Sequence, residues 1–354
     1  MNARAQAATE FDLPERIENT EQLEEALSRP PRRLVEMMAR LEGDLMLIGA
    51  GGKMGPSLAR MARRACDASG VARRVIAVSR FSSPAVADSL ETDGIEIIRC
   101  DLFDPDAFAR LPDVENIVYM AARKFGSYGQ EGATWATNCF LPGLVCQKFG
   151  RSRIVGFSTG NVYPLVPIDS GGSREQDPLE PIGEYAASAV GRERLLGYFS
   201  EQYGFPAAIL RLNYAHELRY GIIVDIAQKV AAGEPVDVTM GYFNAIWQGD
   251  ANAMSLLALE HAASPPLVVN VAGPETLRVR DVAEQLGQEL GQSVSIEGRE
   301  AETALLSNGR RAYELFGRPI IPEGQIIRWI ADWIGRGGPT HGKPTKFEVR
   351  DGQF

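Results

Sequence analysis

The residues with the clearest chemistry in this sequence form a glycine-rich loop between a short apolar run and an amphipathic segment. The loop contains Gly49, Gly51, Gly52, Lys53, Met54 and Gly55. Glycine permits a tight turn and lets backbone N–H groups approach a pyrophosphate, which the positive end of the following helix stabilises. A plain strand–helix turn is the alternative. The strand before the loop, the helix after it and a second strand roughly 20 residues later favour a dinucleotide site.

The end of the second predicted strand indicates which dinucleotide binds. A carboxylate there would bind the ribose 2′-hydroxyl of NAD, but this sequence has Ser79 and Arg80. Arg80 can hold a 2′-phosphate through paired hydrogen bonds, and Ser79 can add a donor. A surface position, or stacking on the adenine, is the alternative for Arg80. We therefore expect NADP as the cofactor, with NAD as the second candidate.

The elements that position this loop predict an α/β fold, a doubly wound parallel (Rossmann) sheet over residues 44–213. Short apolar strands separated by helices are typical of a parallel sheet covered on both faces. The expected strands span 45–48, 74–78, 95–99, 117–120, 153–157 and 207–212, and the expected helices span 56–66, 134–149 and 183–203.

Residues 214–335 are less regular, and we expect them to form mainly a smaller C-terminal substrate-binding lobe. Helices are predicted near 222–232, 250–263 and 279–290, and strands near 236–240, 267–271 and 293–297.

Residues 1–43 are expected to form a helical extension. Asn19 can cap a first helix, and the Gln22 side chain can reach back to the backbone at the start of that helix. Pro30 and Pro31 end the first helix, and a second helix covers 32–41. The extension is either a dimer element or a lid on the sheet edge, and we expect a homodimer. Residues 336–354 are expected to be an extended arm.

The composition limits the class of protein. The 354 residues are 45% hydrophobic and 23% charged, which is typical of a globular chain that needs no metal or disulfide. The net charge of -9 argues against nucleic acid or an acidic membrane as partner. No apolar run approaches the ~20 residues of a membrane span. The three histidines have no metal-site spacing, so no metal is expected. We expect Cys66, Cys100 and Cys139 to be buried free thiols in a cytoplasmic protein.

Several segments together resemble the extended short-chain dehydrogenases, the NAD-dependent epimerase/dehydratase family that includes UDP-galactose 4-epimerase. The resemblance covers about residues 44–275. The matching positions are Gly49, Gly52 and Gly55 for the family's GxxGxxG; Asp101 and Leu102 for its Asp-Leu pair at the adenine; Ala121 and Ala122 beside the cofactor; Thr159 and Tyr163 in its Ser-Ser-x-x-Val-Tyr segment; and Asp250 for a helix-capping aspartate.

The resemblance implies roles for individual residues. Tyr185 would be the acid/base and a cofactor contact, and Thr159 would polarise the substrate. Lys124 matches a lysine near the cofactor phosphates, and Asn138 an asparagine that supports the catalytic loop. Asn213 loosely matches an Arg-x-x-Asn-x-Tyr motif. His216 and Glu217 follow it at the carboxyl end of a strand, where ligands bind in open α/β sheets. Either one of the two lines the substrate pocket, or both are loop residues without a role in binding.

The implied function is NADP(H)-dependent oxidoreduction, or redox-mediated epimerisation or dehydration. The implied substrate is a sugar, sugar acid or nucleotide sugar. One departure bears on this: Ala189 stands where the family's Tyr-x-x-x-Lys motif has lysine. That lysine lies one helical turn from the tyrosine and lowers its pKa, and an unaided phenol near pKa ~10 is a poor base.

Three alternatives follow from Ala189. Lys124, or Arg192 seven residues after Tyr185, replaces the missing cation; the positive nicotinamide lowers the tyrosine pKa; or the chain is a non-catalytic NADP-binding sensor or scaffold. Because Thr159, Tyr163 and Tyr185 are retained, we favour an enzyme.

Other residues have two interpretations each. The basic residues Arg310, Arg311, Lys343, Lys346 and Arg350 either reach an anionic substrate or lie on a solvated surface. Trp329 and Trp333 lie four residues apart on the last predicted helix and are expected to pack in a core or an interface.

Overall fold

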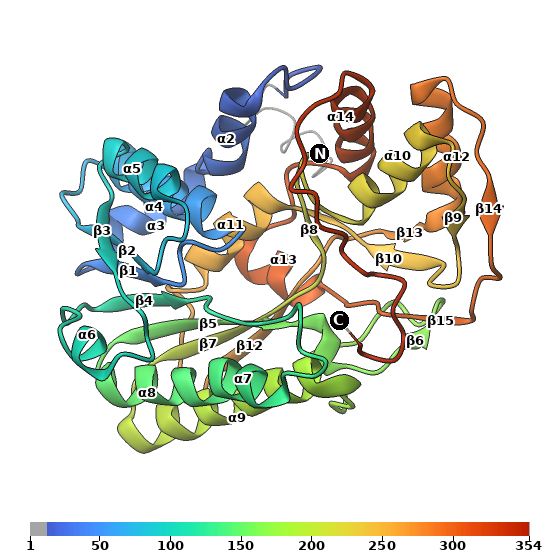
Figure 1. Cartoon of the computed structure of the whole chain (residues 1–354). Helices are drawn as coiled ribbons and strands as arrows, with labels where there is room; N and C mark the ends of the chain where they lie inside the picture. Colours follow the sequence, from blue (N-terminus) through green and yellow to red (C-terminus); the bar gives the residue numbers. More distant parts are fainter. Residues whose placement is uncertain (1–12, 354) are drawn as a thin grey trace.

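The computed structural model describes residues 13–353, and its centre is a parallel sheet of seven strands (Figure 1). The strand order is β3-β2-β1-β4-β5-β7-β12, and every neighbouring pair is parallel. The order reverses between β1 and β4, which opens a crevice at the carboxyl ends of these strands. The predicted doubly wound parallel sheet is therefore confirmed.

The strands of the sheet lie within two residues of predicted strands, although the strand at 267–271 was expected in the C-terminal lobe and instead forms an edge of this sheet. They are β1 (Leu45–Ile48), β2 (Val75–Ser79), β3 (Glu96–Arg99), β4 (Asn116–Tyr119), β5 (Arg153–Thr159), β7 (Ala207–Leu212) and β12 (Leu267–Val271). Alternate residues of β1 face opposite sides of the sheet. Leu45 and Leu47 join one apolar cluster, and Met46 and Ile48 join another. This two-sided burial explains why the strands are continuously apolar in sequence.

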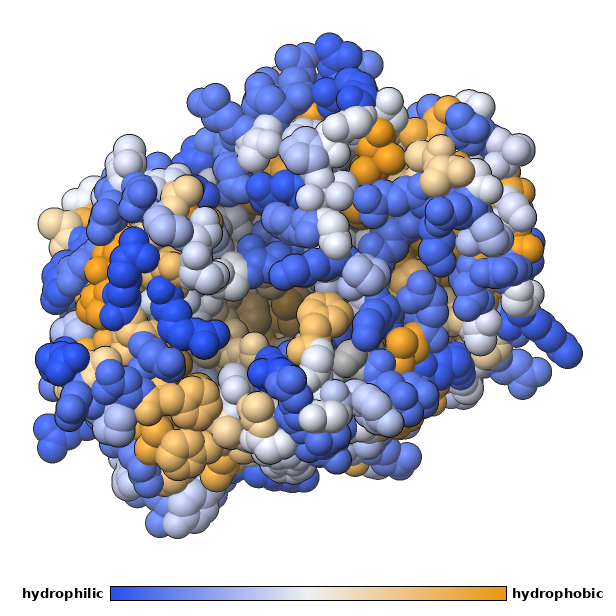
Figure 2. Space-filling view, in the orientation of Figure 1, coloured by the Kyte–Doolittle hydropathy of each residue, from blue (hydrophilic) through white to orange (hydrophobic). Residues whose placement is uncertain are grey.

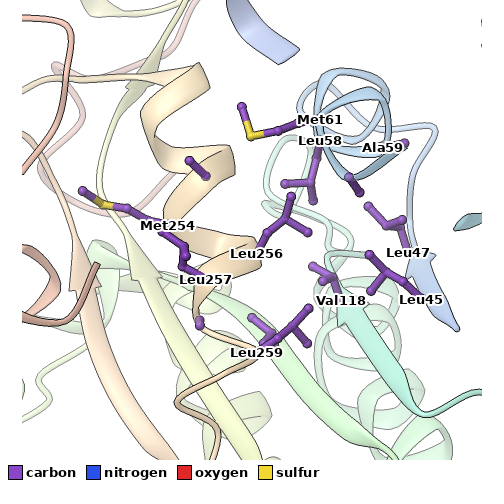
Figure 3. Packing of buried hydrophobic residues seen from close by; sticks show 14 of the residues in the cluster. Leu45, Leu47, Leu58, Ala59, Met61, Val118, Met254, Leu256, Leu257 and Leu259 are labelled. Atoms are coloured by element: carbon purple, nitrogen blue, oxygen red, sulfur yellow. The ribbon is translucent and has the colours of Figure 1, made fainter. Parts of the chain in front are cut away.

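Helices cover both faces of the sheet (Figure 1). One face carries α3 (Arg32–Arg40), α4 (Gly55–Ser69), α5 (Pro84–Thr92), α11 (Gln248–Leu257) and α13 (Arg310–Phe316). The other carries α6 (Pro105–Ala109), α7 (Glu131–Trp135), a π-helical turn (Ala136–Phe140), α8 (Leu141–Lys148) and α9 (Gly183–Tyr203). Figure 3 shows the first core, in which Leu47 and Val118 of the sheet meet Leu58 of α4 and Leu256 of α11.

The first helix of the described residues, α2 (Thr20–Ser28), begins as the sequence predicts. The Asn19 side chain accepts a hydrogen bond from the Gln22 N–H at 2.9 Å, and Gln22 Oε1 accepts from the Glu18 N–H at 2.8 Å. The two bonds satisfy donors that a helix N-terminus leaves free. α2 packs on α4 and α11, and α3 packs on α4. Residues 1–12 of the predicted extension lie outside the described residues.

The smaller lobe contains α10 (Ile222–Ala232), α12 (Val279–Leu290) and α14 (Glu323–Gly335), with short strands between them. Its core includes Trp329 and Trp333, so the predicted packing role of both is confirmed. The strands pair as β8 (Ala215–His216) with β11 (Ile246–Trp247), β9 (Val236–Asp237) with β14 (Ile296–Glu297), β10 (Tyr242–Asn244) with β13 (Thr276–Arg278), and β6 (Val166–Pro167) with β15 (Thr303–Ala304). A 3₁₀ turn covers Gly160–Val162.

Three details differ from expectation. The strands expected near 236–240 and 293–297 shorten to two residues each, because they pair only with one another. The helix expected near 250–263 begins at Gln248 and ends at Leu257. Cys139 is only half-buried, because it lies on the π-helical turn at the surface of α9, whereas Cys66, Cys100 and Cys146 are buried.

Residues 13–353 lack two features, a membrane-spanning helix and a cluster of metal ligands. No helix in that part of the chain is long and apolar enough to cross a membrane. No group of three or more His, Cys, Asp or Glu side chains within it is arranged to hold a metal ion.

Candidate active site

Two connected hollows lie at the carboxyl ends of the strands. The outer groove, of about 820 Å³, runs past the ends of β2 and β3, and the inner cavity, of about 330 Å³, lies between the sheet and the smaller lobe. Both are lined by Gly49, Gly52 and Lys124, so they form one continuous path over the glycine loop. Figure 2 shows the hollowed face, which is deepest near the centre of the view.

Most site residues predicted from the sequence line one of these hollows, but Asn138, Tyr163 and Glu217 line neither. The outer groove is lined by Gly49, Gly51, Gly52, Ser79, Arg80, Asp101, Leu102, Ala121, Ala122 and Lys124. The inner cavity is lined by Gly49, Gly52, Lys53, Met54, Gly55, Ala122, Lys124, Thr159, Tyr185, Asn213 and His216. The fold therefore brings together residues that are up to 167 positions apart, from Gly49 to His216.

The glycine loop is built so that its backbone can approach a ligand. Gly49 has a φ of +96°, and a Cβ atom there would lie 2.6 Å from the Ala121 backbone nitrogen. A Cβ atom at Gly55 would collide with the Ala50 carbonyl, which holds the start of α4 against the loop. The positive end of α4 thus opens on the path between groove and cavity, which fits the pyrophosphate of a dinucleotide.

The end of β2 forms the wall of the outer groove next to the loop. A Cβ atom at Gly51 would lie 2.6 Å from Ser79 Oγ, so loop and strand end are in contact. Arg80 is exposed beside Ser79 and lines the groove, and Phe81 turns the chain back with a φ of +48°. The segment that leaves β2 therefore presents a guanidinium and a hydroxyl at this wall, rather than a carboxylate.

Two hydroxyl groups meet at the bottom of the inner cavity. Tyr185 lies in the first turn of α9, and its hydroxyl is hydrogen-bonded to the Thr159 side chain at the end of β5. Thr159 Oγ1 also donates to Asn161 Oδ1 at 3.0 Å, which orients it. Burial raises the pKa of Tyr185, while the positive charge of Arg192 and the bond to Thr159 act in the opposite direction.

The position of the family's lysine is occupied by an apolar contact. Ala189 is fully buried and packs with Val162 and Tyr163. The nearby cation is Arg192, which lies on the same helix and is 5% exposed. Its Nη1 donates to the Phe157 carbonyl at 2.7 Å and its Nε to the Asn138 carbonyl at 3.2 Å.

The π-helical turn explains why the Asn138 carbonyl is open to Arg192. Pro142 has no N–H to donate to the carbonyl four residues before it, which is that of Asn138. The Asn138 side chain accepts from the Arg123 N–H at 2.8 Å and donates to the Arg123 carbonyl and Ser188 Oγ, both at 2.9 Å. Asn138 therefore connects the loop after β4 to α9, and Arg192 Nη2 keeps a donor with no partner among residues 13–353.

Two lysines approach the inner cavity from opposite sides. Lys124 Nζ lies 5.8 Å from the centre of the Tyr185 ring, and desolvation, together with the charge of Lys346, lowers its pKa to about 8. Lys53 extends from the glycine loop, donates to the Ala215 carbonyl at 3.1 Å and lies 4.2 Å from the centre of the Tyr220 ring. Desolvation of its ammonium within the cavity lowers its pKa to about 8.

The lobe side of the cavity carries two buried polar atoms with no hydrogen-bond partner in the described chain, Asn213 Nδ2 and His216 Nε2. His216 is fully buried, and its Nδ1 lies 2.7 Å from the Tyr214 carbonyl. Burial lowers the pKa of His216 to about 3, so the ring is neutral. Because Nδ1 must donate to that carbonyl, Nε2 is a hydrogen-bond acceptor.

A buried ion pair supports the site from below. Arg211 Nη2 lies 2.7 Å from Glu193 Oε2, and both side chains are 6% exposed. Arg211 Nη1 donates to the Tyr163 hydroxyl at 2.6 Å, and Tyr163 donates to Asn270 Oδ1 at 2.9 Å. This network joins β7, α9 and β12 beneath Thr159.

Some lining residues were not predicted from the sequence, namely Asn161, Tyr214, Tyr220 and Thr345. Asn161 lies within the matched Ser-Ser-x-x-Val-Tyr segment, so that motif was a usable signal. Thr345 belongs to the C-terminal arm, whose neighbouring Lys343 and Lys346 were expected either to reach an anionic substrate or to lie on a solvated surface, but Thr345 itself was not singled out. Of the basic candidates, Arg310 pairs with Glu314 at the surface and Arg350 with Thr303, away from the cavity.

Comparison with known proteins places the chain in a family. The model of the "NAD dependent epimerase/dehydratase family" matches residues 45–272. The chain belongs to this family. The match agrees with the resemblance expected over about 44–275, and an NAD(P) cofactor suits the groove and loop described above. The curated proteins include no match to the sequence.

Solved structures share the fold at low identity. A UDP-glucuronic acid 4-epimerase from Bacillus cereus, in complex with UDP-glucuronic acid and NAD, is 18% identical with a TM-score of 0.70 and covers 83% of this chain and 99% of its own. A dTDP-glucose 4,6-dehydratase from Streptomyces venezuelae is 21% identical with a TM-score of 0.70, covering 83% and 97%. A Thermus thermophilus UDP-glucose 4-epimerase is 20% identical with a TM-score of 0.67, covering 83% and 99%.

Proposed function

We propose that the protein binds NADP in preference to NAD and uses it to oxidise, reduce, epimerise or dehydrate a sugar or sugar-acid derivative. The observation that carries the proposal is the meeting of Tyr185, Thr159 and the charge of Arg192 beside the glycine loop. When bound, the nicotinamide supplies a site that accepts or donates hydride. The preference for NADP rests on Ser79 and Arg80 at the groove wall.

Tyr185 is the acid/base in this proposal. Its hydroxyl exchanges a proton with a substrate hydroxyl or carbonyl, and Thr159 orients that group through its own hydroxyl. Arg192 is a positioning residue, because it acts on Tyr185 through its charge and through the carbonyls it holds. Its charge favours the phenolate and so takes over part of the role of the missing lysine.

The experiment is a screen of sugars, sugar acids and nucleotide sugars, followed at the nicotinamide absorbance band for net oxidation or reduction and by product analysis for epimerisation or dehydration. Tyr185→Phe should lower turnover of the substrate found by about 10²–10⁴-fold, the usual contribution of acid/base catalysis. Tyr198→Phe is the matched control, because Tyr198 is exposed on the same helix. Unchanged turnover in Tyr185→Phe would remove Tyr185 from the mechanism.

A pH profile tests Arg192 separately. Oxidation requires the phenolate, so turnover rises with pH through the pKa of Tyr185. Arg192→Met should raise that pKa, because a positive charge that favours the phenolate is removed, and the rise should move to higher pH. Arg192→Lys should restore part of the shift. An equal loss of rate at every pH would indicate a purely structural role.

The second candidate function is a non-catalytic NADP sensor or scaffold. Two observations favour it: the apolar packing at Ala189 and the raised pKa of Tyr185. Tight NADP binding with neither a substrate-dependent absorbance change nor conversion of any compound to a new product would support this candidate over the enzyme.

A further inference from the structure

The C-terminal arm forms one wall of the inner cavity. Thr345 lines the cavity and is anchored to α10, because its N–H and Oγ1 both donate to Asp225 Oδ2, at 2.8 and 2.6 Å. Two residues further, Phe347 is buried in the lobe core beside Phe243. The arm is therefore fixed to the lobe where it passes the cavity.

The arm then reaches the start of the catalytic helix. Arg350 donates to the Thr303 carbonyl at 2.9 Å, and Gly352 lies against Ile182 and Gly183. A Cβ atom at Gly183 would lie 2.6 Å from the Gly352 carbonyl, so the contact is close-packed. Figure 1 shows the arm descending from α14 past β8 to the chain end near β6. It thus spans the gap between α10 and α9.

The room that remains is small. Binding pockets for small molecules measure about 300–1,000 Å³. The inner cavity, at about 330 Å³, is at the lower end, and its lining includes both the glycine loop and Tyr185. The reacting end of the cofactor must share this space with the substrate. A substrate the size of one sugar unit can lie wholly within this space, whereas the nucleotide part of a nucleotide sugar would have to lie outside it.

The polar groups on the lobe side of the inner cavity match a particular kind of ligand. His216 Nε2 is an acceptor and Asn213 Nδ2 a donor, and neither has a partner among residues 13–353. Lys53 adds an ammonium that donates to the Ala215 carbonyl, lies over the face of Tyr220 and is near enough to the Glu217 and Asp225 carboxylates for their charges to raise its pKa. A donor, an acceptor and a cation suit neighbouring hydroxyls and a carboxylate.

We infer that the inner cavity takes a free sugar acid, one monosaccharide unit with its carboxylate at Lys53 and a hydroxyl donating to His216 Nε2. The inference rests on the proposed function, since it names the substrate class of the same site. It separates this chain from its solved structural neighbours, one of which is described with UDP-glucuronic acid. An anion at Lys53 would also compensate the desolvation that lowers the pKa of that ammonium.

The test uses the full chain saturated with NADP⁺ and isothermal titration with named probes. The free acids are D-glucuronate, D-galacturonate and D-gluconate; the comparison ligands are D-glucose, UDP and UDP-glucuronic acid. We expect at least one free acid to bind more tightly than D-glucose, and UDP to give no heat. Tighter binding or faster turnover of UDP-glucuronic acid than of every free acid would overturn the inference.

Substituted variants test where the carboxylate of the sugar acid binds. Lys53→Met should weaken binding of that acid about 10- to 100-fold, because a charge-assisted hydrogen bond is lost, and should leave D-glucose unchanged. Lys343→Met is the matched control, because Lys343 is an exposed lysine on the C-terminal arm, just before Thr345. The affinity of each variant for NADP⁺ shows whether the substitution has disturbed the glycine loop. Equal weakening of acid and neutral sugar would contradict the placement at Lys53.

The two proposals fail in different ways. If no compound changes the nicotinamide absorbance and none is converted to a new product, the proposed reaction is wrong, while the titrations still decide whether the cavity prefers a free acid. If UDP-glucuronic acid is the substrate, the reaction stands and only the inferred substrate class is wrong.

Discussion

Replacing Arg80 should change which dinucleotide binds. Arg80 and Ser79 stand at the groove wall that touches Gly51, so a ribose held at the loop reaches them. A hydrogen bond to a charged group contributes about 1.5–3 kcal/mol. Arg80→Ala should therefore weaken NADP⁺ by about 10- to 100-fold and leave NAD⁺ nearly unchanged. Arg80→Asp should reverse the preference, since its carboxylate repels the 2′-phosphate and accepts from a 2′-hydroxyl.

Isothermal titration of both dinucleotides at fixed ionic strength measures these affinities. The salt must be fixed because Arg80 is exposed, and exposed charges are screened over about 8–10 Å at physiological salt. Arg99→Ala is the control, because Arg99 is exposed at the end of β3 and does not line the groove. Raising the salt should reduce the advantage of NADP⁺ in the wild type and have little effect in Arg80→Ala.

Two results would refute this reasoning. Tighter binding of NAD⁺ than NADP⁺ by the wild type would show that Arg80 does not select the phosphate. Equal weakening of both dinucleotides in Arg80→Ala would instead indicate that Arg80 stacks on the adenine, which the two cofactors share.

Two further predictions concern stability. Burial raises the pKa of Asp250 from 3.8 to about 7, so the fold favours the protonated form. Its stabilising contribution is complete below about pH 4 and is lost as the pH rises through 7. In urea unfolding this group should make the protein about 2–3 kcal/mol less stable at about pH 8 than at about pH 5, and Asp250→Asn should abolish that difference. Arg211→Met should cost about 3–5 kcal/mol, because it leaves Glu193 charged and buried, and adding Glu193→Gln should recover part of the loss. A pH-dependence that survives in Asp250→Asn, or an Arg211→Met loss below about 1 kcal/mol, would show that these groups are not coupled to folding as described.

The elements of the sheet were predictable because their signals are local. β7 and α9 lie at the predicted residues, since an apolar run and a long periodic segment each mark their own ends. The glycine loop and the end of β2 were predictable for the same reason. The short strands β9 and β14 were not, because their length depends on pairing between segments about 60 residues apart.

The substrate side of the site depended on contacts that sequence spacing does not contain. Thr345 reaches the cavity through a bond to Asp225, 120 residues earlier. From the sequence, Arg192 was one candidate to replace the missing lysine. The sequence did not show that its guanidinium donates to the Phe157 and Asn138 carbonyls. The second of these is open because of Pro142, which the sequence shows only as an irregularity in a helix.

The anchoring of Arg192 has a consequence for how Tyr185 is tuned. A lysine at position 189 would carry its charge on a flexible stem, which leaves its donors for a ligand. Arg192 instead donates two hydrogen bonds to backbone carbonyls, which fix its guanidinium to the scaffold. The charge that acts on Tyr185 therefore belongs to the scaffold. We therefore expect Arg192 to act on the pKa of Tyr185 without contacting the cofactor. Arg192→Met should shift the pH profile of turnover far more than it changes the affinity for NADP⁺. A loss of NADP⁺ affinity as large as the loss of turnover would show that Arg192 holds the cofactor directly.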